Sequence, residues 1–68
     1  MDIIEKELDS RRSEIKKQVE LLFRANMTIT DWDVPEADDH KAAKILISII
    51  KEAVADIEKD IEAGKYDY

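Results

Sequence analysis

Residues 43–61 read AKILISIIKEAVADIEKDI and carry the strongest structural pattern of the chain. Its large apolar residues recur at steps of three and four from Leu46 to Ile61, and this spacing places them on one face of an α-helix. The block ILISII alone also fits a buried strand, but the helical period continues well beyond it, so length favours a helix. We predict this helix over about residues 38–63, with Gly64 as the residue that ends it.

The first part of the chain has the same period, and we predict a second helix over about residues 2–26. Neither Gly nor Pro interrupts residues 2–25. Its apolar stripe also includes Arg11 and Gln18 at two intervening positions. The apolar members of the stripe are Ile4, Leu8, Ile15, Val19 and Leu22.

Between the two helices we predict an acidic loop at about 27–37, with a short tail at 64–68. Thr30 and Asp33 have the spacing of a capping box, and Pro35 suits the first turn of a helix because it lacks an N–H group. These signals place the start of the second helix between residues 35 and 39. Together the segments form one domain, residues 1–68.

Two helices joined by one loop make an antiparallel hairpin, so the fold class is all-α. A chain of 68 residues without cysteine has neither disulfides nor a thiolate metal site to stabilise a small core. Apolar residues outside the main stripes, such as Ile45 and Ile49, also need cover. We therefore expect a homodimer that forms a four-helix bundle. The predicted dimer interface consists of Leu46, Ile47, Ile50, Val54 and Ile57.

The net charge of −6 comes almost entirely from one segment. Residues 27–39 contain five acidic residues and no Lys or Arg, whereas acids and bases nearly balance before and after it. The longest uncharged run in the second half, ILISII, is far shorter than the roughly 20 residues of a membrane span, and the N-terminus lacks the features of a secretory signal. We expect a soluble, cytoplasmic protein with no membrane partner.

The acidic segment DWDVPEADD, residues 31–39, is the candidate partner-binding site. One or two acids suffice to cap a helix, whereas five repel one another, and Trp is the residue type most often found as an interface anchor. We expect a docking surface for a protein with a basic surface. Its predicted residues are Asp31, Trp32, Asp33, Glu36 and Asp38. The alternative is a solvated turn whose acids cap the second helix while Trp32 folds back as a lid over the hairpin.

The same segment does not fit a calcium loop. Counted from Asp31, an EF-hand would have Pro35 at its fifth position, Glu36 in place of the turn glycine and Ala42 in place of the bidentate Glu. The single His40 has no Ser, Cys or second His placed beside it by any pattern. We therefore expect no metal, no cofactor and no enzymatic activity, and interpret the chain as a small interaction or regulatory protein.

An alternative function is RNA or DNA binding by a hairpin dimer through the basic residues Arg11, Arg12, Lys16 and Lys17. At 100° per residue these four side chains spread around the helix, with Asp9 and Glu20 between them. Mimicry of nucleic acid is less favoured, because mimicry needs carboxylates along a whole face and here they gather in one loop.

Overall fold

The computed structural model describes residues 2–36 and 38–67. Three residues lie outside this described part: Met1, Ala37 and Tyr68. The predicted loop includes Ala37 and the predicted tail includes Tyr68, so these two predictions fall partly outside it. Within the described part the chain is all-helical, as predicted, and forms α1 (Ile3–Ser10), α2 (Arg12–Asp33) and α3 (Asp39–Glu62). None of these helices combines the length and apolar character that crossing a membrane requires.

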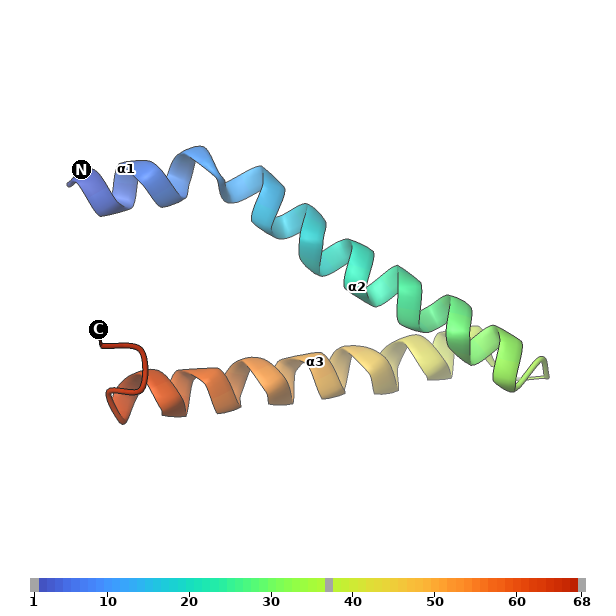
Figure 1. Cartoon of the computed structure of the whole chain (residues 1–68). Coiled ribbons are helices and arrows are strands. Elements are labelled where there is room, and N and C mark those ends of the chain that lie inside the picture. The colour runs from blue at the N-terminus through green and yellow to red at the C-terminus, as the bar shows by residue number, and fades with distance from the viewer. Residues whose placement is uncertain (1, 37, 68) are drawn as a thin grey trace.

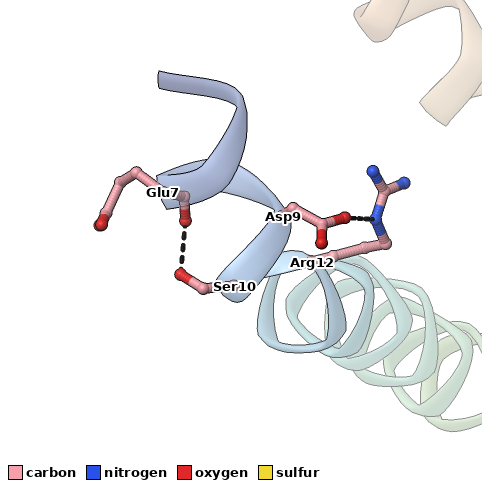
Figure 2. A network of polar contacts seen from close by, with 4 residues as sticks. All are labelled: Glu7, Asp9, Ser10 and Arg12. Carbon is pink, nitrogen blue, oxygen red and sulfur yellow. Dashed lines mark hydrogen bonds and ion pairs between the residues drawn. The ribbon is translucent and has the colours of Figure 1, made fainter. Parts of the chain in front are cut away.

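The helix predicted as continuous over residues 2–26 is broken at Arg11. The Ser10 hydroxyl donates a hydrogen bond of 2.7 Å to the Glu7 carbonyl, the group that the Arg11 N–H would use in a regular helix (Figure 2). The Arg11 N–H donates instead to the Leu8 carbonyl at 3.1 Å, and Arg11 has φ −104° and ψ 3°. The chain therefore bends between α1 and α2 (Figure 1).

The prediction that this helix ends at residue 26 is wrong, because α2 continues to Asp33. The Thr30 hydroxyl donates to the Asn26 carbonyl at 2.9 Å, so Thr30 is part of the helix and does not cap α3. Pro35 ends α2, since a proline disfavours the helical conformation for the residue before it. Val34 accordingly has φ −134° and ψ 77°. The connection that remains runs only from residue 34 to residue 38.

The ends of α3 follow established capping geometry. The Asp38 carboxylate accepts hydrogen bonds from the backbone N–H groups of His40 at 3.0 Å and Lys41 at 3.4 Å. At the other end Gly64 has φ +80°, and its N–H donates to the Ile61 carbonyl at 3.0 Å. The predicted role of Gly64 is thus confirmed, because a positive φ is accessible to glycine without strain.

Helices α2 and α3 run in opposite directions, meet beside the connection and diverge toward the termini (Figure 1). Phe23 and Met27 on α2 and Ala43, Leu46 and Ile50 on α3 are half-buried at this junction, and no described residue is fully buried. The radius of gyration is 15.9 Å, whereas a compact chain of this length has about 11 Å. The arrangement is an open hairpin without a closed core.

Candidate functional site

The candidate site is the closed end of the hairpin, where α2 ends and α3 begins (Figure 1). We call it the acidic end. It comprises Asp31, Trp32, Asp33, Glu36, Asp38 and Asp39. Asp31 to Asp33 lie in the last turn of α2, Glu36 lies in the connection, and Asp38 and Asp39 begin α3.

Trp32 projects into solvent at the acidic end, with 82% of its surface exposed. The lid interpretation required Trp32 to cover apolar residues of the hairpin. It is instead held in the last turn of a regular helix, on a backbone that continues to Asp33. A large aromatic surface is therefore available beside several carboxylates.

The local electrostatics are unfavourable at the end of α2. The last turn of α2 contains Asp31 and Asp33 but no basic residue, although the carbonyl end of a helix carries partial negative charge that favours cations. At the start of α3 the relation is reversed, because the acids Asp38 and Asp39 lie near the positive end of the helix dipole. The sequence therefore stabilises the start of α3 and places repulsion at the end of α2.

Asp39 approaches Asp31 across the connection. The hydrogen bond with Asp39, followed by partial desolvation and the charge of Asp39, raises the pKa of the Asp31 carboxyl above its ordinary value of 3.8. Asp39 was not among the residues predicted for the site. The signal that could have found it is the antiparallel turn, because a five-residue connection brings the last turn of one helix beside the first turn of the next.

All five residues predicted for docking are exposed, and Asp38 has in addition a local structural role as the cap of α3. Among the described residues, His and acidic side chains do not gather in any group of three suited to a metal ion. His40 lies exposed in the first turn of α3. The chemistry that the acidic end offers is a negative surface with one aromatic side chain.

The residues predicted for the dimer interface fall into two groups. Leu46 and Ile50 are half-buried within the hairpin, beside α2. Ile47, Val54 and Ile57 remain exposed. Two open grooves flank the contact between α2 and α3. One is lined by Thr30, Val34, Ile45 and Ile49 among others, and the second by Val19, Phe23, Ile47 and Ile50 among others.

The four basic residues considered for nucleic-acid contacts have different surroundings. Arg11 lies at the bend between α1 and α2, and the Arg12 Nε lies 2.9 Å from the Asp9 Oδ1 (Figure 2). Lys16 lines the groove between α2 and α3, and Lys17 is exposed. The structure does not bring the four together into one cationic surface.

No family model, curated protein or solved structure matches this chain.

Proposed function

We propose that this protein is a small, non-enzymatic interaction or regulatory protein that docks to a basic protein surface through its acidic end. The observation that carries the proposal is Trp32, which is 82% exposed between two aspartates at the end of a helix. An exposed Trp on a fixed backbone costs little conformational entropy to bury, and it supplies the kind of anchor that dominates many interfaces.

The charge distribution supports the same proposal. Acids at the carbonyl end of α2 weaken that helix, so their presence there is not explained by the stability of the free chain. A cationic partner would relieve this repulsion on binding. Such a cluster also accelerates encounter with a positive surface at low ionic strength.

Two copies of the chain form the functional unit in this proposal. The open hairpin leaves apolar side chains exposed along both α2 and α3. A second hairpin would cover them and complete a four-helix bundle, while each acidic end stays at the tip of its own hairpin.

The test compares wild type with Trp32→Ala and with Tyr66→Ala, which removes another exposed aromatic side chain at the open end. Each is immobilised and exposed to lysate of the source cells and to a helical peptide rich in Lys and Arg. We expect retention by wild type and Tyr66→Ala, loss of retention by Trp32→Ala, and weaker retention at high salt.

Equal retention by all three variants would contradict the proposal. Retention of RNA or DNA that is lost in Arg12→Glu, but not in Trp32→Ala, would favour the alternative function through the basic residues of α2.

A further inference from the structure

Helix α2 has a second apolar face that α3 does not cover. Ile15, Leu22 and Ile29 recur every seven residues and leave 39%, 53% and 56% of their surfaces exposed. Phe23 and Met27, which are half-buried beside α3, lie roughly a third of a turn away from this face at 100° per residue. One apolar residue every seven supplies one of the two seam positions of a helix that packs along another helix. We call Ile15, Leu22 and Ile29 the outer stripe.

The exposed area of the chain matches the needs of a homodimer. The chain exposes 6311 Å². A compact monomer of 7.9 kDa exposes about 4,400 Å² by the size scaling of globular proteins, so the excess is about 1,900 Å² per chain. Two chains that bury this excess form an interface of about 3,800 Å², within the range of about 2,000–5,000 Å² for obligate homodimers. A second copy of the chain is thus a sufficient occupant.

We infer that the second copy packs antiparallel on the outer stripe, with Leu22 of one protomer against Leu22 of its partner. The inference rests on the dimer in the proposed function and specifies its surface and orientation. Ile15 and Ile29 lie seven residues before and after Leu22. The two-fold axis therefore places Ile15 of one protomer against the partner's Ile29. Gln18 and Asn26, four residues on either side of Leu22, then lie opposite each other. The Asn26 Nδ2 already donates a hydrogen bond of 2.9 Å to the Leu22 carbonyl of its own helix, so its amide oxygen is the group left to face Gln18.

The charged residues at the ends of the stripe decide the orientation. Arg11 and Asp33 lie eleven residues before and after Leu22, within about 20° of its direction on the helix. The Arg11 carbonyl accepts a hydrogen bond from the Ile15 N–H at 3.0 Å, so Arg11 keeps the register of α2 despite the bend. Antiparallel packing places Arg11 beside Asp33 at both ends of the seam. Parallel packing would place Arg11 beside Arg11 and Asp33 beside Asp33.

This seam depends on the observed length of α2. A helix that ended at residue 26 would contain neither Ile29 nor Asp33, and the symmetry about Leu22 would be lost. The antiparallel arrangement also separates the two acidic ends. The dimer therefore carries one docking surface at each of its two ends, in which Asp33 lies beside the partner's Arg11 while Asp31, Trp32 and Glu36 face the docked protein.

Cysteine cross-linking tests the surface and the orientation, because the native chain contains no cysteine. We expect Leu22→Cys to form a disulfide with itself under mild oxidation. Arg11→Cys and Asp33→Cys should remain unlinked when each is oxidised alone, and should link to each other when the two variants are mixed. Lys17→Cys, more than a third of a turn from the outer stripe, is the control that should not link.

Charge reversal gives an independent measurement by sedimentation equilibrium. Arg11→Asp should raise the dimer dissociation constant about tenfold or more, because it places two like charges together at each end of the seam. Adding Asp33→Arg to the same chain should restore most of the affinity. In a parallel dimer Arg11→Asp would replace one pair of like charges with another, so the dissociation constant would stay nearly unchanged and the second substitution would have nothing to restore.

The possible failures are distinguishable. A wild-type chain that sediments as a monomer overturns both the inference and the proposed dimer. A dimer in which Arg11→Cys and Asp33→Cys each link to themselves is parallel, and a dimer without a Leu22→Cys link uses another surface such as α3. Both of these results overturn the inference and leave the proposed dimer in place.

Discussion

At the scale of single residues, the pair of Asp31 and Asp39 makes the closed end of the hairpin sensitive to pH. The hydrogen bond that raises the pKa of Asp31 requires one of the two carboxyls to be protonated. The folded chain therefore binds a proton at Asp31 more readily than the unfolded chain does. As a consequence, the contribution of this pair to the free energy of unfolding rises as pH falls from neutral through the raised pKa toward 3.8, and this contribution is lost as pH rises again.

Asp31→Asn should remove this dependence. The amide can donate a hydrogen bond to Asp39 at any pH, so the variant should melt at a higher temperature than wild type at pH 7. The difference should shrink as pH approaches 3.8, because wild type regains the proton there. Thermal unfolding followed by circular dichroism, from pH 7 down to about pH 3.8, measures this difference in melting temperature. Asp39→Asn removes the other half of the pair and should likewise flatten the dependence of the melting temperature on pH. A difference in melting temperature between wild type and Asp31→Asn that stays constant with pH would contradict the explanation.

Trp32 illustrates how exposure separates a docking residue from a structural one. Because 82% of its surface is exposed, Trp32→Ala should change the free energy of unfolding by no more than about 0.5 kcal/mol. Its fluorescence should be red-shifted and readily quenched by iodide or acrylamide. Phe23→Ala, on the half-buried face of α2, is the matched change that should cost more. A protected Trp32 whose removal destabilises the chain strongly would identify it as a lid.

At the scale of helices, the caps determine where α3 begins and ends. Asp38→Ala should lower the free energy of unfolding by about 1 kcal/mol, because it leaves two backbone N–H groups of the first turn without their acceptor. Glu36→Ala removes a neighbouring acid that caps no helix and should change stability much less. Chemical denaturation of both variants measures the difference, and equal losses would show that charge alone, and not capping, accounts for the effect.

The helices also show what the sequence could predict. The period of apolar residues and the glycine at position 64 determine α3 almost completely, since both act locally. At the break the Ser10 hydroxyl donates to the Glu7 carbonyl and the Arg11 N–H donates to the Leu8 carbonyl, an arrangement that the spacing of apolar residues does not predict. The end of α2 is not predictable from Thr30 and Pro35, because the same residue types also suit the start of a helix.

The geometry of the acidic end depends on where α2 ends. With α2 ending at residue 26, Asp31 to Asp38 would belong to a long loop whose residues have no fixed neighbours. With α2 ending at Asp33, Trp32 has a fixed direction and Asp31 meets Asp39. The residue types of the acidic end were evident from composition, but their geometry depends on a helix boundary, which is the least predictable feature of a local pattern.

At the scale of the whole molecule, an open hairpin in which no described residue is buried has little to hold it together as a single chain. The half-buried contact between α2 and α3 involves only a few side chains near the closed end, whereas most of the stability of a helix in a protein comes from the packing of its amphipathic face. Folding and association should therefore be coupled, as in obligate homodimers that have no stable folded monomer.

Coupling predicts that the unfolding midpoint of wild type rises with protein concentration over the micromolar range, because mass action favours the folded dimer.

Leu22→Asp, on the exposed outer stripe, should lower both the sedimenting mass and the helical content, although Leu22 makes no buried contact within its own chain. Ile50→Asp should also lower the sedimenting mass and the helical content, because it places a charge in the half-buried contact between α2 and α3. Lys17→Asp, away from both faces, controls for the added charge. A midpoint independent of concentration, together with full helicity in Leu22→Asp, would mean that one hairpin is stable alone and that its exposed apolar surface serves a different partner.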